Sequence, residues 1–563
     1  METRMIILAL INGFINFSAL CQSFPYSTTP DWQSTPAGHI ATGLGLADIN
    51  GDGWKDIIVA NGNDIQLQHL VVYYNAGDGT FPSMPDWQSD DTDYHGHLAV
   101  GDIDKDGWID VAVSVYIGSS GFGDPGKVKV YYNTGGELEG TPSFVSYSFY
   151  TFSCSLGDAD ADGDLDLATT GGEPYNSIYD AGKIFYNRNG TFSLNPEWET
   201  SIAFGSLDVE FGDADNNGFQ DLIFISEETP NYIYLADSNG IISTSPSWQS
   251  AEPTNYINSV DFGMIGEFKH PGIVMTGNNQ LGGDGRVRLY TFAGGVPAAS
   301  SAVWSSDPFG YGSGILLSDV NLDGLPDLIY GGWWLPVKIH LAQNSVFETI
   351  PAYTSSTNSV VEAIQVADLD RDGINVTSEQ IIISGNDKST FYLQKQLVEN
   401  ILSVQLNGKT VNQSFWCSVP NKNWISFNDN IKTGDVLIVE YEYSDDGDMV
   451  ITNWDSNIGN YIFYYDESTG ISANQPVPGD LSVQITPNPM SDKVTLILSH
   501  PFAGSAQIKI TDLEGRQVIF LQRVYLNKGY NTCEIPVTGL PAGVYRVVVS
   551  AGNSREIRKL VKM

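Results

Sequence analysis

The strongest constraint on the fold is an acidic motif that recurs about every 55 residues. It reads "DINGDGWKD" from Asp48, "DIDKDGWID" from Asp102, "DADADGDLD" from Asp158, "DADNNGFQD" from Asp213, "DVNLDGLPD" from Asp319 and "DLDRDG" from Asp368. The starts lie 54, 56, 55, 106 and 49 residues apart, and the stretch 260–277 fills the double gap with the same apolar flanks but without the acids. Such self-similarity indicates seven copies of one structural unit.

Each copy predicts four short strands. One apolar strand precedes the acidic turn, a second follows it ("DIIVANG", "DVAVSV"), a third is aromatic ("KVKVYYN"), and a fourth often carries Trp ("EWET", "SWQS"). Four strands in each of seven units predict an all-β, seven-bladed β-propeller. One further "DWQS", at 31–34, has no earlier blade, and we expect it to be the fourth strand of the last blade, which closes the ring without an open sheet edge.

The acidic turns also predict calcium sites, because Ca²⁺ takes six to eight oxygen ligands and a Gly permits the tight turn. Side chains at positions 1, 3, 5 and 9 are the candidate ligands. They are Asp48, Asn50, Asp52 and Asp56; Asp102, Asp104, Asp106 and Asp110; Asp158, Asp160, Asp162 and Asp166; Asp213, Asp215, Asn217 and Asp221; and Asp319, Asn321, Asp323 and Asp327. The fifth copy has Met264, Gly266, Phe268 and Gly272 at these positions, so no ion is expected there. About six structural Ca²⁺ ions are therefore expected.

An EF-hand is excluded because it needs flanking helices and an acid at position 12, where these loops have Val59, Val113, Thr169, Phe224 and Tyr330. The blade-sized repeat and the D-x-[DN]-x-[DN]-G-x-x-D motif, recurring in register over residues 31–373, instead resemble the FG-GAP/VCBS repeats of integrin-α-type propellers.

The seventh acidic turn lacks its late Asp, because Val376 stands at that position. In one interpretation the blade continues directly and Glu379 supplies the missing carboxylate. In the other, which we favour, a small β-domain is inserted at 374–444, and the blade resumes with "DMVITNWD", so that Asp448 joins Asp368, Asp370 and Asp372. The second interpretation explains why a second pair of blade-like strands appears 75 residues later, and loop tips tolerate insertions.

Both ends of the chain carry export features. Residues 1–21 read as a signal peptide, with Arg4 before an apolar run and small residues at the end, and no later segment is apolar enough to span a membrane. The formal charge is −40, which argues against nucleic-acid binding. Residues 483–563 reverse this charge to +5, which marks a separate domain after a Gly/Pro/Ser-rich linker at 468–482.

This C-terminal domain resembles the type A sorting domain of the type IX secretion system. The resemblance rests on "PNP" at 487–489, "DLEGRQV" at 512–518, "LPAGVYRVVV" at 540–549 and the basic end "KLVKM". It implies a β-sandwich that engages the type IX secretion machinery, and export across the outer membrane with release or attachment at the cell surface.

The predicted organisation is a signal peptide (1–21), propeller blades one to six with the start of blade seven (22–373), the insertion (374–444), the remainder of blade seven (445–467), the linker (468–482) and the sorting domain (483–563). Loops between the second and third strands offer aromatic side chains as candidate stacking platforms: Phe122, Tyr175, Tyr179, Trp333 and Trp334. No triad, phosphate loop or His cluster is present, so we favour an adhesion or binding propeller for a glycan or protein ligand. A lyase-like polysaccharide-active enzyme and a structural surface-layer component are the alternatives.

Overall fold

The computed structural model describes residues 24–466, apart from 37, 228–229, 252–255, 281 and 456, and residues 482–562, apart from 487–492, 501–503, 513–515, 527–528, 538–539 and 552–553. The expected signal peptide and nearly all of the expected linker lie outside the described residues. The chain divides into two compact units, one spanning Tyr26–Tyr465 and the other containing the C-terminal domain. Within the described residues there are two short 3-10 turns, η1 (Pro174–Asn176) and η2 (Gln413–Phe415), and no α-helix.

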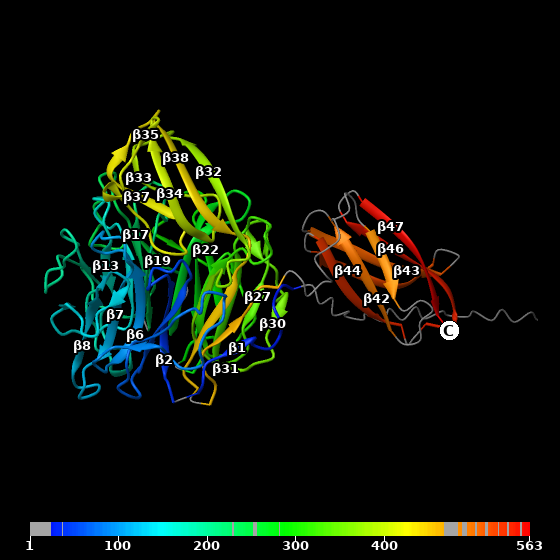
Figure 1. Cartoon of the computed structure of the whole chain (residues 1–563), viewed down its shortest axis with the longest axis horizontal. Helices are drawn as coiled ribbons and strands as arrows, with labels where there is room; N and C mark the ends of the chain where they lie inside the picture. The colour runs from blue at the N-terminus through cyan, green and yellow to red at the C-terminus, as the bar shows by residue number, and fades with distance from the viewer. Residues whose placement is uncertain are drawn as a thin grey trace, which may run out of the picture. The chain divides into compact units, whose positions relative to one another are not determined.

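Antiparallel strands in the first unit pair in groups of four that follow the sequence repeat (Figure 1). The first three groups are β2 (Ala41–Ala47), β3 (Asp56–Asn61), β4 (Val71–Tyr73) and β5 (Trp87–Gln88); β6 (Tyr94–Gly101), β7 (Asp110–Ile117), β8 (Pro125–Tyr131) and β11 (Phe144–Val145); and β12 (Cys154–Gly157), β13 (Asp166–Thr169), β14 (Lys183–Phe185) and β15 (Trp198–Glu199). The next three are β16 (Gly205–Gly212), β17 (Asp221–Glu227), β18 (Tyr232–Tyr234) and β19 (Trp248–Ser250); β20 (Ile257–Ile265), β21 (His270–Gly277), β22 (Val287–Thr291) and β24 (Trp304–Ser305); and β25 (Gly312–Ser318), β26 (Asp327–Leu335), β27 (Lys338–His340) and β30 (Tyr353–Thr354).

The last group contains β31 (Ser359–Ala367), β39 (Asp448–Asn453), β40 (Tyr461–Phe463) and β1 (Trp32–Gln33). Further strands of two residues each lie outside these groups of four: β9 (Asn133–Thr134), β10 (Glu137–Leu138), β23 (Ala299–Ser300), β28 (Ala342–Gln343) and β29 (Val346–Phe347).

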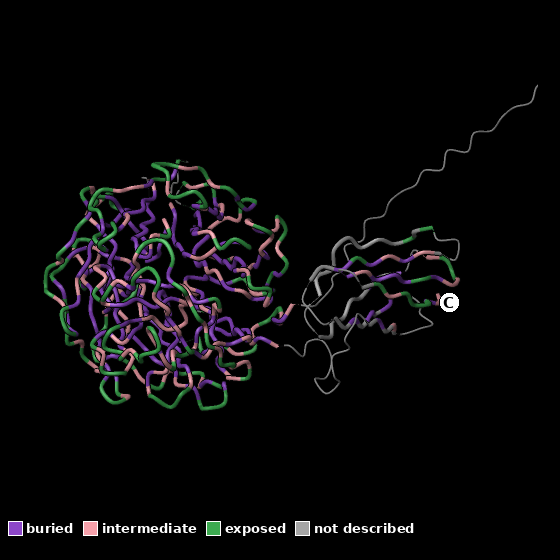
Figure 2. The backbone as a smooth tube through the Cα atoms, turned by 90° about the horizontal axis from the view of Figure 1, so that it is seen from above, coloured by how far each residue is buried: buried purple, intermediate pink, exposed green. Residues whose placement is uncertain are grey.

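The first strands of the groups form the inner wall of a closed ring. In chain order β2, β6, β12, β16, β20, β25 and β31 each contact the next, and β31 contacts β2. Seen from above, buried backbone makes up much of the propeller, and many of the exposed segments are loops along its outline (Figure 2). Small residues permit this close approach: a Cβ at Gly96 would overlap the backbone carbonyl of Phe152, which lies just before the next inner strand β12.

The N-terminal strand closes the ring, as the isolated "DWQS" predicts. Trp32 pairs with Ile462 and Gln33 with Tyr461, so β1 is the outer strand of the last blade. The Trp32 indole packs edge-on against Tyr73 and Phe81 of the first blade, with ring centroids 5.8 and 5.9 Å away. Its N–H donates to the Phe81 carbonyl at 2.9 Å. The two ends of the ring therefore share one apolar core.

Between β31 and β39 the chain builds a separate two-sheet domain, which stands on one end of the propeller (Figure 1). One sheet contains β32 (Ile374–Ile382), β38 (Val436–Ser444), β34 (Val398–Leu406) and β35 (Lys409–Thr410). The other contains β33 (Lys388–Tyr392), β37 (Trp424–Ile431) and β36 (Trp416–Cys417). Buried side chains of both sheets, such as Phe391, Ile425 and Val439, form its own core. Below, this is called the inserted domain.

The C-terminal unit is an all-β domain of two sheets. One contains β41 (Ser482–Thr486), β42 (Lys493–His500) and β45 (Gly529–Pro536). The other contains β44 (Gln517–Leu526), β43 (Gly504–Asp512), β46 (Gly543–Ala551) and β47 (Ser554–Lys562). Val494, Leu496, Ile508 and Val547 are fully buried in one shared core, as expected for a sandwich.

The closure contact makes a stability prediction. We expect Trp32→Ala to lower the free energy of unfolding of the propeller by about 3 kcal/mol, because it removes a large side chain from the seam between first and last blade. Urea unfolding followed by tryptophan fluorescence and circular dichroism measures the change. Gln33→Ala, which truncates an exposed neighbour in the same strand, is the control. Equal stability of the two variants would contradict a role of Trp32 in closing the ring.

Candidate metal turns, channel and ligand face

The acidic turns share one hydrogen-bonding pattern. In the first, Asp48 accepts the N–H of Gly53 at 2.8 Å, and Asp56 accepts two further backbone N–H groups, from Ile49 at 3.0 Å and from Asn75 at 2.9 Å. The bond to Gly53 fixes the turn, and Asp56 ties the turn to the third strand of its blade. The first carboxylate accepts the glycine N–H in the same way at Asp102, Asp158, Asp213, Asp319 and Asp368.

Several turns bring carboxylates close enough to share one cation. Within the described residues, four groups each offer oxygens that all lie within 4.8 Å of one another: Asp102, Asp104 and Asp110; Asp158, Asp160 and Asp166; Asp213, Asp215 and Asp221; and Asp368, Asp370, Asp372 and Asp446. The first and sixth turns, which have Asn50 and Asn321 at position 3, keep the hydrogen bonds of the others. The fifth turn is made of Met264, Gly266 and Phe268, and Phe268 is exposed.

Burial makes these carboxylates costly to ionise without a cation. It raises the pKa of Asp56, Asp110, Asp158 and Asp213 to about 7 each, although backbone N–H groups or a Ser hydroxyl oppose the rise. Neighbouring carboxylates of the same turn raise the pKa further. Desolvation combined with like charge is the environment that a bound divalent cation relieves.

At the seventh turn, Asp448 takes the place of the late carboxylate and Glu379 does not. Asp448 accepts the N–H of Leu369 and the N–H of Tyr465, both at 2.8 Å, as Asp56 does in the first blade. Glu379 instead accepts from Gln394 N–H and the Tyr441 hydroxyl within the inserted domain.

The carboxylate that converges with Asp368, Asp370 and Asp372 is nevertheless Asp446, which the sequence reasoning missed. Its position could have indicated it, because Asp446 precedes Asp448 by the two residues that separate Trp54 from Asp56. It thus occupies the position that Trp54 holds in the first turn.

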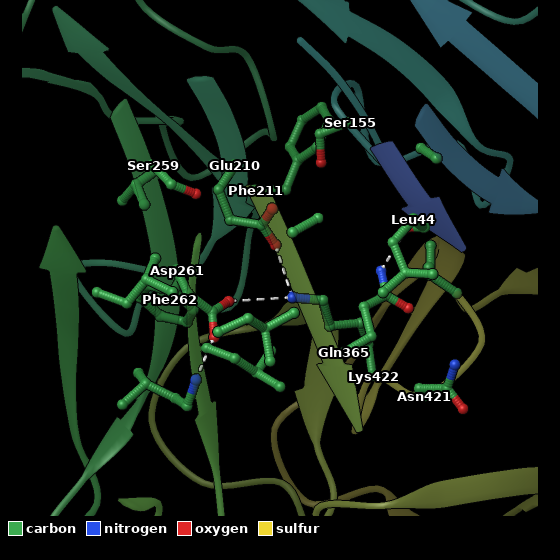
Figure 3. A pocket seen from close by; sticks show the side chains of 18 of the residues that line it. Leu44, Ser155, Glu210, Phe211, Ser259, Asp261, Phe262, Gln365, Asn421 and Lys422 are labelled. Atoms are coloured by element: carbon green, nitrogen blue, oxygen red, sulfur yellow. Dashed lines mark hydrogen bonds and ion pairs between the residues drawn. The ribbon is translucent and has the colours of Figure 1, made fainter. Parts of the chain in front are cut away.

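The ring encloses a cavity of about 230 Å³, lined by the inner strands and by residues 419–424 of the inserted domain. Lys422 enters this channel, and its ammonium lies 3.0 Å from Glu210 and 3.2 Å from Asp261 (Figure 3). Both carboxylates raise the pKa of Lys422 against the effect of burial, so the lysine is held charged. The inserted domain therefore places a cation at the mouth of an otherwise acidic channel.

Further along the channel, buried carboxylates are already engaged by donors. Asp208 accepts from Ser153 at 2.6 Å and Ser259 at 3.0 Å, and its carboxylate lies 3.4 Å from His97. Glu362 accepts from Ser313 at 2.6 Å and from the indole of Trp333 at 2.7 Å. These hydrogen bonds hold both carboxylates in the wall of the channel.

Phe122, Tyr175 and Tyr179 lie between the second and third strands of their blades, whereas Trp333 and Trp334 lie near the end of the second strand β26, so all five occupy the face opposite the acidic turns. Their exposed fractions are 37% for Phe122, 43% for Tyr175, 43% for Tyr179 and 50% for Trp334. Trp333 is half-buried, because its indole donates to Glu362. Of the five predicted residues, Trp333 is thus packed against the protein, whereas the other four aromatic side chains remain accessible.

Trp334 belongs to an aromatic cluster that the sequence reasoning only partly found. Its ring centroid lies 6.5 Å from Trp333, 6.2 Å from Trp454 and 6.1 Å from Tyr311, all edge-on. Trp454 also donates its indole N–H to Glu362. Trp334 has a φ of 57°, a left-handed conformation that is rare for a bulky residue. Trp454 directly follows the second strand of the last blade, and this position in the repeat could have indicated its role from the sequence.

Two segments match known protein families. Residues 48–113 match the FG-GAP-like repeat, and residues 484–563 match the secretion system C-terminal sorting domain. The sorting domain directs export by the type IX system across the outer membrane, to the cell surface or the extracellular space. None of the described helical segments is both long and apolar enough to span a membrane.

Individual relatives are similar over short stretches. Cartilage acidic protein 1 of Mus musculus is 37% identical over 79 residues, which cover 13% of this chain and 12% of that protein. Integrin alpha-3 of Mus musculus is 27% identical over 121 residues, which cover 19% and 10%. The matched stretches therefore span about a tenth of these relatives.

Solved structures that align with this chain include BBS1N in complex with ARL6DN, with 11% identity, a TM-score of 0.42, and coverage of 78% of this chain and 98% of that one. The Vibrio cholerae biofilm matrix protein Bap1 has 11% identity, a TM-score of 0.31, and coverage of 96% and 91%. The fold of this chain is therefore defined by its own strand pairings and not by these similar structures.

The raised pKa values predict how pH affects the metal-free protein. A carboxyl with a pKa near 7 in the folded state and near 4 in the unfolded state binds protons more tightly when folded. Stability in a chelator should therefore fall as pH rises from about 4 to about 7, and the melting temperature should be lower at pH 8 than at pH 5.5. Calorimetry in EGTA measures this change.

Asp56→Asn removes one buried titrating group and should flatten this dependence, whereas Asp78→Asn, at an exposed carboxyl, should leave it unchanged. A metal-free protein that melts higher at pH 8 would contradict the assignment.

Proposed function

We propose that this exported FG-GAP repeat protein is a calcium-stabilised binding module that recognises a glycan on the propeller face opposite its acidic turns. The observation that carries the proposal is Trp334, a half-exposed indole held in an unusual backbone conformation by a packed aromatic cluster. A rigid, accessible aromatic ring is the element that stacks on a sugar face or anchors a protein ligand. Binding, rather than catalysis, is favoured because Asp208 and Glu362 are already occupied by protein donors.

The open face also indicates what charge the ligand carries. Burial raises the pKa of the Tyr175 hydroxyl, and the carboxylates of Glu227, Glu362, Asp64 and Glu173 raise it further. Carboxylates from four different blades thus influence one exposed aromatic residue. Three of these carboxylates, Glu173, Glu227 and Glu362, are buried, so they act on a ligand through the negative potential of the face, which disfavours anionic polymers. We therefore expect a neutral or cationic glycan, and a protein ligand of basic character is the second outcome to test.

Calcium would be held by the carboxylates of the acidic turns. The converging oxygens of the second, third and fourth turns fit a hard cation, and the raised pKa values show that the bare groups are strained by charge and burial. When bound, each ion would supply two positive charges between the first and second strands of its blade. Ligation there would stabilise the turn that sets the inner wall of the ring.

Chelation tests the calcium assignment. The melting temperature should fall when EGTA replaces 1 mM Ca²⁺, because each site whose Kd is a hundredth of the free ion concentration contributes about 2.7 kcal/mol. Readdition of Ca²⁺ should restore stability. Readdition of Mg²⁺ should restore much less, because Mg²⁺ demands a tighter octahedral shell. An unchanged melting temperature in EGTA would rule out stabilising sites.

Ligand binding is tested on a glycan array, followed by titration of any hit. Trp334→Ala should weaken binding at least about tenfold, because removing an aromatic anchor commonly costs more than 1 kcal/mol. Phe268→Ala removes a more exposed aromatic ring, 75% accessible, from the opposite face and is the matched control. Equal losses in both variants would contradict the assigned face. New reducing or unsaturated ends in the incubated glycans would instead indicate an enzyme.

A further inference from the structure

The neck of the inserted domain coincides with the seventh acidic turn. The chain leaves the propeller after Gly373 and returns at Ser444, and these ends are joined because Ile374 pairs with Ser444 in the inserted domain's first sheet. A Cβ on Gly373 would overlap the side chain of Asp446. The Asp445 N–H donates to the Gly373 carbonyl at 3.1 Å. Departing and returning segments therefore meet at the turn itself.

Hydrogen bonds cross this neck onto the first carboxylate of the turn. Ser444 donates its hydroxyl to Asp368 Oδ2 at 2.7 Å, and Gly373 donates its N–H to the same oxygen at 3.2 Å. The Asp446 N–H in turn donates to the Ser444 hydroxyl at 2.9 Å. Asp368 is thus held by both the departing and the returning segment, and one of its oxygens remains for another partner.

Two buried carboxylate oxygens at this neck have no hydrogen-bond partner within the described residues. They are Oδ1 of Asp368 and Oδ1 of Asp446, and the two side chains are 0% and 4% exposed. Oxygens of both lie within 4.8 Å of oxygens of Asp370 and Asp372. An unpaired buried carboxylate oxygen is costly, and a cation bound among these four carboxylates would supply the missing partner to both.

We infer that Asp368, Asp370, Asp372 and Asp446 form a four-carboxylate Ca²⁺ site that fastens the inserted domain to the propeller. The inference rests on the calcium binding proposed above and adds a ligand from the far side of the inserted domain, which gives this site a role in holding that domain. Three carboxylates come from the departing segment and the fourth from the returning segment, about 70 residues later. The ion closes the neck in the same way that a crosslink closes a loop.

Contacts at two other acidic turns show what the fastened neck holds in place. Ser426 of the inserted domain donates to Asp158 Oδ2 at 2.6 Å in the third turn. Ser389 and Thr390 donate their N–H groups to the Gly218 carbonyl in the fourth turn, at 3.1 and 2.9 Å. Lys422 reaches the channel between these contacts. An ion at the neck therefore keeps the inserted domain docked over the channel mouth.

The test compares Asp446→Asn with Asp445→Asn in the full chain. Both variants remove one negative charge at adjacent positions, but the Asp445 carboxylate is 43% exposed and contacts Lys395 at 3.5 Å. Ca²⁺ is the probe, and equilibrium dialysis with elemental analysis counts the bound ions. We expect Asp446→Asn to lose one ion, or to bind it at least about tenfold more weakly, and Asp445→Asn to bind as the unchanged chain does.

Hydrogen exchange gives the second readout. At saturating Ca²⁺ the amides of 374–376 and 442–446 should exchange faster in Asp446→Asn than in Asp445→Asn, whereas those of 102–107 in the second turn should not change. Asp372→Asn alters an exposed ligand and should reproduce the same losses if Asp446→Asn does not fold.

Unchanged ion number and unchanged exchange at the neck would overturn the inference. If the unchanged chain binds no Ca²⁺ at all, the proposed calcium function fails as a whole. If it binds Ca²⁺ and loses one ion in Asp104→Asn but none in Asp446→Asn or Asp372→Asn, only the neck site fails.

Discussion

A buried carboxylate that accepts two backbone N–H groups is the interaction on which each acidic blade depends. Asp56 joins the N–H of Ile49, in the turn, to that of Asn75, beyond the third strand. Asp110, Asp166, Asp221 and Asp327 make the equivalent pair of bonds. Because the carboxylate is buried, these two donors compensate for part of the hydration that it loses on folding. The acidic turns and the inner wall of the ring are thus joined through one buried hydrogen-bonding group.

The last blade keeps this interaction although its chain is interrupted. Asp448 makes both backbone bonds from the far side of the inserted domain. The inserted domain thus interrupts the acidic turn at a point where the pairing of the blade's strands and the late carboxylate are both retained. Its placement also brings Lys422 into the channel and hydroxyl groups onto neighbouring acidic turns, so the inserted domain covers the face of the propeller that carries the acidic turns.

Much of this arrangement was predictable because it is periodic. The repeat of "D-x-D-x-D-G" fixes where strands begin, and the spare "DWQS" predicted the pairing of Trp32 with Ile462. Asp448 was favoured over Glu379 because it precedes an apolar run as Asp56 does. The sequence reasoning missed Asp446 and Trp454, because their roles depend on neighbours distant in the chain: the first three acids of the turn for Asp446, and Trp334 for Trp454.

The sequence by itself determined the all-β blades, the acidic turns, the ring closure and the sorting domain, since each follows from local patterns of apolar, acidic and turn-forming residues. Only the tertiary structure decided which carboxylates converge at the neck, which aromatic rings stay exposed, and that a lysine of the inserted domain forms ion pairs with Glu210 and Asp261. The physical reason is that charge pairing and exposure depend on distances in space. In a ring with an inserted domain, residues separated by hundreds of positions become direct neighbours.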